Sequence, residues 1–473
     1  MVTRSLLCAA LLALAGCVCQ TPTYVRPTST GDPWNTTSLI DADPASVSTA
    51  DLTSHVQVVN QRYWAHSQVN GIIWPALRTD TALPDPDRWV TGGDSGIFTG
   101  TALAAFAFQY KAEPSTEGLQ HAFDTLRGLY ILTHSTGTPG VIQRNAFPAD
   151  QPDKFGYPAE WASRIAAGFV HTGPAFDDPF GGPQIPPQTY YTRGTKDQLT
   201  GMVLGLAAAW TVFDPATVFP AHIPTATSMR DVVKQITQDI AVHLYAYDWY
   251  IRDEYGHNDT NADHVSGLLK AALLALVVKT GVAPAQEDYD KEFSNFMLTV
   301  PALIISDRFS NFQQYYAHNL RVSRAISIWL LEGPGSPKGQ QVASYIGTNV
   351  WDFTKGHKNA WFAFAQGITT PSDAAAVAEG LYALKSLSLK PLRGWSSPYH
   401  GQAHKPDLGA VASGCTSLFA LDPHLRKPVA YTTWQKEPWD VGDEPDWDKQ
   451  GLLETSGLDF LLAYWMGKAY GLF

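Results

Sequence analysis

Aspartates open three apolar segments of the chain, and carboxylates in such a set are typical of acid–base chemistry. The segments "DSGIFTGTALAAFAF" from Asp94, "DQLTGMVLGLAAAW" from Asp197 and "DHVSGLLKAALLAL" from Asp263 share this start. Each continues through a Thr-Gly or Ser-Gly pair into a run of Ala, Leu and Gly. Paired carboxylates transfer protons in general acid–base catalysis and are the working groups of glycosidic-bond hydrolysis. Asp94, Asp197 and Asp263 are therefore the predicted catalytic residues.

Helix capping is the plain alternative for each of these residues. Thr195-x-x-Gln198 has the pattern of a capping box, and Asp197 in the first turn gains about 0.3–1 kcal/mol from the helix dipole. The same dipole favours the charged carboxylate, so Asp197 and Asp263 are expected to be base-like. A proton donor needs a drier place, and Asp94 or Glu454 is the expected donor. Capping explains one residue at a time but not the whole set.

A polysaccharide lyase would use other groups, typically Asn, His, Tyr and Arg. Residues of these types stand near later helix starts: His318, Asn319, His357, Asn359, Tyr315 or Tyr316, and Arg321. The sequence leaves hydrolase and lyase both open. In either case, the predicted substrate-binding residues are Arg144, Arg193, Gln198, His264, His318, Asn319, His357, Asn359, Trp395 and Trp434.

Two kinds of helix that alternate along the chain must position these residues. Amphipathic helices are predicted over 49–65, 117–134, 228–244, 287–303, 338–352 and 372–387. Helices that are apolar on nearly every face, and therefore buried on every face, are predicted over 98–110, 195–213, 262–279, 314–332, 354–367 and 456–470. The predicted fold is all-α, an (α/α)6 toroid of six inner and six outer helices whose inner N-termini converge at one end.

Two long segments interrupt the helices and are predicted to be irregular insertions. Residues 135–194 and 388–455 are rich in Gly, Pro and aromatic residues. Long ordered loops commonly have a function, and aromatic side chains on them can line a binding cleft. A small satellite core under the loops would explain the tryptophans equally well. Arg144 and Arg193 flank the first insertion, where each can bind an acidic group or pair with an aspartate.

The composition of the chain indicates which partners the protein can bind, and its N-terminus indicates where the protein is located. The net charge of -11 argues against nucleic acid as a partner. A short apolar run over 6–15 predicts a secretory signal, and the following Leu-Ala-Gly-Cys17 resembles a bacterial lipobox in which Cys17 is lipidated. Plain cleavage after Ala13-Leu14-Ala15 is the alternative. Four cysteines predict neither a disulfide framework nor a zinc site, and no cofactor or metal is expected.

The alternation of helices and the "DQLTG" and "DHVSG" starts resemble the six-hairpin (α/α)6 superfamily of carbohydrate-active enzymes. The resemblance is architectural and implies no particular catalytic motif. It covers residues 49–473, which are predicted to form one toroid domain. The N-terminal pattern predicts residues 1–19 as a signal region, and a composition rich in Pro, Thr, Ser and Asp predicts residues 20–48 as a flexible tether. The expected function is an exported glycan-processing enzyme, first a glycoside hydrolase and second a polysaccharide lyase, acting on an oligo- or polysaccharide. A non-catalytic lipoprotein that binds a glycan or a protein is the third alternative, and the only membrane contact expected is a lipid anchor at Cys17.

Overall fold

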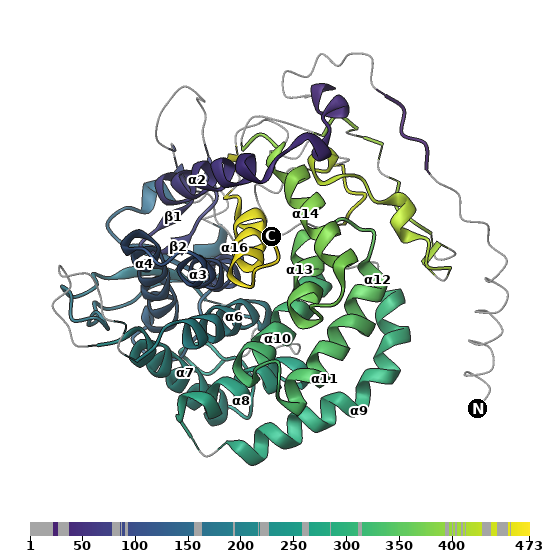
Figure 1. Cartoon of the computed structure of the whole chain (residues 1–473). Coiled ribbons are helices and arrows are strands. Elements are labelled where there is room, and N and C mark those ends of the chain that lie inside the picture. The colour runs from purple at the N-terminus through teal and green to yellow at the C-terminus, as the bar shows by residue number, and fades with distance from the viewer. Residues whose placement is uncertain are drawn as a thin grey trace.

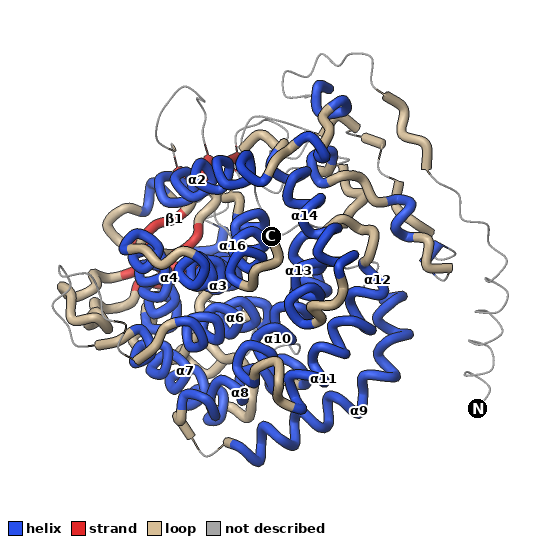
Figure 2. Tube along the Cα trace, viewed as in Figure 1, coloured by secondary structure: helices blue, strands red, loops and turns tan. Residues whose placement is uncertain are grey.

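The chain is mostly helical, and every helix predicted from the pattern is present. The structure is a computed structural model. It describes residues 22–26, 37–77, 86, 88–89, 93–155, 163–192, 194–215, 217, 227–257, 264–283, 285–310, 315–392, 397–399, 401–402, 404–407, 410–411, 413–427, 437–441, 453–454 and 456–473. Figure 1 shows the arrangement of the helices, and Figure 2 shows how little strand accompanies them.

One group of helices buries nearly every side chain. Its members are α3 (Ser95–Ala112), α6 (Lys196–Val212), α8 (Gly267–Thr280), α10 (Tyr316–Glu332), α13 (Ala360–Thr369) and α16 (Leu458–Ala469). Their contacts run in a closed order: α3 with α6, α6 with α8, α8 with α10, α10 with α13, α13 with α16, and α16 with α3. Helix α6 also contacts α10 directly. The apolar sequence of these helices is thus explained by contact with neighbours on all sides.

The other helices are amphipathic and alternate with the buried ones along the chain. They are α2 (Thr49–His66), α4 (Thr116–His134), α7 (Met229–Ala246), α9 (Gln286–Ser310), α11 (Pro337–Tyr345) with its continuation, and α14 (Ala374–Ser388). Helix α7 illustrates the pattern, because Val232, Ile236 and Ile240 are buried while Asp231 and Lys234 are exposed. In Figure 1 these helices surround α3, α6, α10, α13 and α16. Helix α11 continues as a π-helix, Ile346–Trp351, and a short α12, Asp352–Thr354.

Helices α3 and α6 approach each other through glycines. A side chain at Gly100 would lie 2.1 Å from the carbonyl oxygen of Gly201, and one at Gly205 would lie 2.3 Å from that of Gly100. Only glycine permits backbones to come this close. The Thr-Gly pairs that begin both segments therefore serve helix packing, as the small residues of the sequence predict.

The third copy of the repeated start does not behave like the first two. Gly201 lies inside α6, whereas the equivalent Gly267 is the first residue of α8 and has a left-handed φ of +58°. A side chain on Gly267 would meet nothing closer than 4.0 Å, so this glycine makes no close helix contact. The shared spacing of "DQLTG" and "DHVSG" thus predicts a common structure that the two segments do not have.

The first insertion carries a small sheet rather than irregular chain alone. Strands β5 (Asn145–Pro148), β7 (Gln188–Tyr191) and β6 (Val170–Thr172) form an antiparallel sheet in that order. A second sheet has the order β4 (Arg88–Trp89), β3 (Ala76–Leu77) and β8 (Leu453–Glu454). Strands β1 (Gln68–Val69) and β2 (Ile72–Ile73) form a hairpin. The second insertion contributes the short 3-10 helices Thr416–Phe419 and Pro423–Leu425.

The segment expected to be a tether contacts the body at its described residues. The backbone N–H of Val25 donates to Gln402 Oε1 at 2.7 Å, and Gln402 Nε2 donates back to the Val25 carbonyl at 2.8 Å. Residues Thr37–Asp41 and Pro44–Ser46 form 3-10 helices. Cys415 is disulfide-bonded, although no disulfide framework was expected. Within the described part of the chain, no helix is both long and apolar enough to cross a membrane.

Candidate active site at the helix starts

Asp94 stands at the N-terminal end of α3 and is held by groups from two other segments. Its Oδ1 accepts a hydrogen bond from Gln198 Nε2 at 3.0 Å and lies 3.6 Å from Arg144 Nη1. Arg144 is placed there by its own backbone, because its carbonyl accepts the Gly96 N–H of α3. The carboxylate occupies the N-cap position but makes no capping hydrogen bond, and its side chain remains 39% exposed. The Asp94 carboxylate thus contacts Gln198 and Arg144 instead of capping α3.

Gln198 completes the capping box that its sequence pattern predicts and also connects two helix starts. Its Oε1 accepts the Thr195 N–H at 2.9 Å, while the other end of the amide donates to Asp94. The side chain is fully buried. Gln198 is therefore a buried residue that positions Asp94, whereas the sequence predicts that it contacts the substrate.

Asp197 contacts a third helix start. The hydroxyl group of Tyr316, the first residue of α10, donates a hydrogen bond of 2.9 Å to Asp197 Oδ2. Burial, together with the charges of Asp197 and Asp94, raises the pKa of the Tyr316 phenol. Gln198, the neighbour of Asp197 in α6, donates to Asp94, so the two aspartates belong to one polar cluster. The starts of α3, α6 and α10 therefore meet at this cluster.

Arg324 supports this cluster from within the fold, and sequence reasoning missed it. Its Nε donates to Thr200 Oγ1 at 2.9 Å, one turn beyond Asp197 in α6. Burial lowers the pKa of the Arg324 guanidinium, and the charge of Asp197 acts in the opposite direction. A cation buried near a carboxylate stabilises the charged pair. The signal that could have found Arg324 is a basic residue inside the otherwise apolar helix "NLRVSRAISIWLL".

His318 and His357, with the residues that follow them, lie in the interior. His357 uses both ring nitrogens, at 3.3 Å from the Tyr315 hydroxyl and at 2.8 Å from Thr416 Oγ1. Asn359 caps α13 by accepting the N–H groups of the two residues after Ala360. Among the described residues, His318 has no hydrogen-bond partner at either nitrogen. Both histidines are fully buried and Asn319 and Asn359 nearly so, which suits packing and capping better than substrate binding.

These two histidines predict a loss of stability in acid. Burial lowers the pKa of both His318 and His357 from 6.5 to about 3. Between these values the unfolded chain binds protons that the folded chain does not, so stability is present above pH 6.5 and is lost progressively as the pH falls. Each imidazole is expected to contribute a slope of about 1.4 kcal/mol per pH unit in the free energy of unfolding. Urea denaturation at pH 7, 5.5 and 4.5 measures how the free energy of unfolding changes with pH.

The variant His318→Phe is expected to remove the contribution of His318 to this pH dependence and to leave that of His357. Stability at pH 7 should stay intact, since Phe fits the aromatic neighbours Phe353 and Phe362. His257→Phe is the matched control, because His257 is 75% exposed. Equal slopes for the two variants would show that burial of His318 has no part in the acid sensitivity.

Other predicted residues lie elsewhere. His264 precedes α8, is half-buried and packs on Tyr250 with ring centroids 4.8 Å apart. Glu454, a candidate proton donor, is fully buried, pairs with Arg62 of α2 and lies 2.9 Å from His66 Nδ1. Asp263, Arg193, Trp395, Trp434 and Cys17 lie outside the described residues. Among the residues that are described, no group of three or more His, Cys, Asp or Glu side chains is arranged to hold a metal ion.

The site therefore consists of Asp94, Asp197 and Tyr316, with Arg144, Gln198 and Arg324 around them. It offers two carboxylates, one phenol and two guanidinium groups where three helices begin. Comparison of the chain with known protein families, with curated proteins and with solved structures finds no match.

Proposed function

We propose that the protein is an exported glycoside hydrolase whose active site is the cluster of Asp94, Asp197 and Tyr316. One observation carries the proposal: Asp94 and Asp197 stand at adjacent helix starts, and Gln198 and Tyr316 link these starts to each other and to α10. Hydrolysis of a glycosidic bond requires a pair of carboxylates facing the same bond.

The proposal also includes the arrangement of the helices. We take the closed order of contacts among the six buried helices, with amphipathic helices between them in sequence, to form an (α/α)6 toroid. In such a toroid the inner N-termini share one end, and the polar cluster joining α3, α6 and α10 supports this reading. Export and lipidation at Cys17 enter the proposal from the sequence of the N-terminus alone.

Asp197 is assigned the role of general base toward the attacking water. Its partner Tyr316 donates a hydrogen bond to it and orients the carboxylate. Asp94 faces the Arg144 guanidinium and accepts from Gln198, contacts that stabilise a charged carboxylate. We therefore assign Asp94 to the positive charge that develops on the sugar ring in the transition state, rather than to proton donation. As the oxygen of the attacking water bonds to the anomeric carbon, Asp197 takes the proton of that water, and the leaving oxygen takes its proton from solvent water as its bond to the sugar breaks.

The lyase alternative is less well supported by the same side chains. A tyrosine that abstracts a proton needs a pKa close to the working pH, whereas burial and two carboxylates raise that of Tyr316. The His and Asn residues that a lyase would use are buried, and His357 is already hydrogen-bonded at both nitrogens.

One assay separates the alternatives. The full chain is incubated with a panel of neutral and uronate-containing polysaccharides, and both new reducing ends and the absorbance of unsaturated uronates are followed. The expected result is new reducing ends without that absorbance. Reducing ends together with the absorbance would identify a lyase, and binding without turnover would identify a non-catalytic glycan-binding protein.

A further inference from the structure

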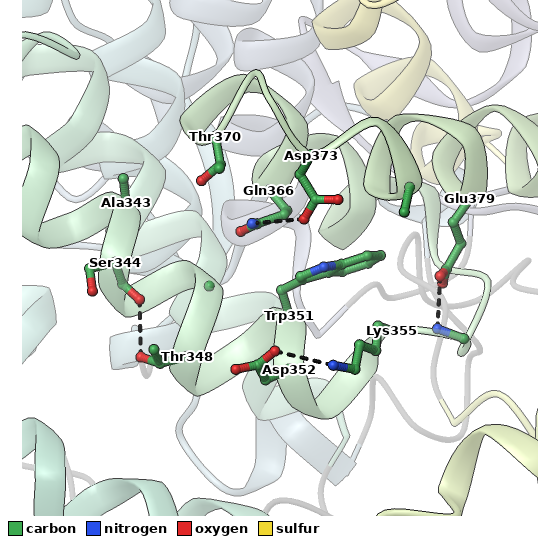
Figure 3. Close-up of a pocket in the computed structure, with 13 residues that line it drawn as sticks. Ala343, Ser344, Thr348, Trp351, Asp352, Lys355, Gln366, Thr370, Asp373 and Glu379 are labelled. Atoms are coloured by element: carbon green, nitrogen blue, oxygen red, sulfur yellow. Dashed lines mark hydrogen bonds and ion pairs between the residues drawn. The ribbon is translucent and has the colours of Figure 1, made fainter.

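A hollow lies away from the cluster around Asp94 and Asp197. It occupies about 760 Å³ between the π-helix Ile346–Trp351 and helix α14, alongside α13 (Figure 3). None of its described lining residues belongs to the cluster around Asp94 and Asp197. A volume of this size is within the range of small-ligand sites. We call it the outer groove.

The helix that borders the outer groove is locally irregular. Residues Gly347, Thr348 and Trp351 of the lining all belong to the π-helix between α11 and α12. Single π-turns inside α-helices are rare and occur frequently at functional sites, because they rotate side chains out of the regular helical register. Here the turn carries Trp351 to the floor of the groove, where its indole packs on Ala363 and Ala376. Figure 3 shows this indole between Asp352 on one side and Gln366 and Asp373 on the other.

Gln366 supplies a polar atom that the fold leaves unsatisfied. The side chain is 6% exposed, its Nε2 donates to Asp373 Oδ2 at 3.1 Å, and its Oε1 has no hydrogen-bond partner in the part of the chain that the structure describes. The carboxylate can only accept, so the orientation of the amide is fixed. Opposite it stands Gly347, whose missing side chain would lie 3.6 Å from Oε1. An orphaned buried acceptor costs free energy unless a ligand or water donates to it.

The charges around the outer groove select the ligand. Lys355 is the cation among its described lining residues, and it is already paired with Asp352 at 3.3 Å. Glu379 uses both carboxylate oxygens on the N–H groups of Gly356 and Lys358, at 2.7 and 2.8 Å. Asp352, Asp373 and Gln366 offer hydrogen-bond acceptors, and the neutral hydroxyl groups of Ser344, Thr348 and Thr370 also line the groove. An anionic ligand would be repelled, whereas a neutral molecule with several hydroxyl groups and an apolar face would be matched.

We infer that the outer groove is a binding site for a neutral carbohydrate, with a sugar ring over Trp351 and a hydroxyl group donating to Gln366 Oε1. This inference goes beyond the proposed catalytic cluster and shares none of its residues. It gives the chain a second glycan contact that can hold a polysaccharide away from the point of cleavage.

Binding is measured with the full chain carrying Asp197→Asn, so that no substrate is consumed. The probes are neutral gluco-, xylo-, manno- and galacto-tetrasaccharides, with a uronate tetrasaccharide and CaCl2 as comparisons, followed by calorimetry and saturation-transfer NMR. Gly347→Leu fills the outer groove in front of Gln366. Gly335→Leu is the matched control, since a side chain there would meet nothing within 4 Å.

At least one neutral tetrasaccharide is expected to bind, and Gly347→Leu is expected to weaken it about tenfold or more, through loss of the ring contact and the hydrogen bond. Gly335→Leu should leave the affinity unchanged. The inference is overturned if no neutral probe saturates below about 10 mM, if Gly347→Leu binds as well as the control, or if only uronate or calcium binding responds to the variant. Failure of the proposed hydrolase is seen separately, as absence of new reducing ends from the unmodified chain.

Discussion

Replacing Asp197 by Asn is expected to lower kcat on the glycan that the protein cleaves by roughly 10²–10⁴-fold, the usual contribution of a positioned acid or base. The fold should survive, because an amide oxygen still accepts the hydrogen bond that Tyr316 donates to Asp197 Oδ2. KM is expected to change little if the carboxylate acts mainly in the transition state. Initial rates from the reducing-end assay, with the thermal midpoint measured in parallel, provide the test.

The matched control for this experiment is Asp51→Asn. Asp51 also lies in the first turn of its helix, α2, where it completes a capping box with Ser48. It is therefore a helix-start aspartate with a structural role only. We expect Asp51→Asn to cost some stability and no activity. If both variants retain full activity, Asp197 is a residue of the helix start and has no part in catalysis.

The helices could be predicted because their signal is local. Each buried helix is apolar around its whole circumference and each amphipathic helix repeats with a period near 3.6, so all twelve were located from the sequence. The start of α13 is the clearest error in their bounds. The predicted helix begins at residue 354, whereas α13 begins at Ala360, because Gly356 and Lys358 adopt left-handed φ values of +80° and +52° and Asn359 provides the cap.

The candidate site could be predicted only where it lies within one segment. Asp94 and Asp197 were found because each opens an apolar helix, and the capping box of Gln198 is a local pattern. The sequence does not distinguish Tyr315 from Tyr316, because the contact of Tyr316 with Asp197, 119 residues away, depends on the packing of α6 on α10. The donation from Gln198 to Asp94 likewise depends on the glycine-mediated approach of α3 and α6. Local spacing carries no information about these contacts.

Replacing Gly201 by Ala is expected to destabilise the protein by about 3 kcal/mol, although alanine favours a helix by about 1 kcal/mol over glycine. The added methyl group would lie 2.0 Å from the Ile97 carbonyl oxygen, so the backbones of α3 and α6 must separate. Both helices are buried and packed on other neighbours, which leaves little room for such a shift. Urea denaturation at pH 7 measures the change as a lower midpoint with an unchanged slope.

Gly347→Ala is the matched control, because its methyl group would meet Gln366 only at an ordinary contact distance of 3.6 Å. It is expected to be neutral or stabilising by up to about 1 kcal/mol.

Separation of α3 from α6 also moves Asp197 relative to Asp94, so Gly201→Ala should lose activity at temperatures where it is still folded. A positional error of about 1 Å at a catalytic group is enough to cost roughly 10²-fold in rate. Equal midpoints for the two variants would contradict the close contact of α3 and α6, and with it the geometry on which the two carboxylates depend.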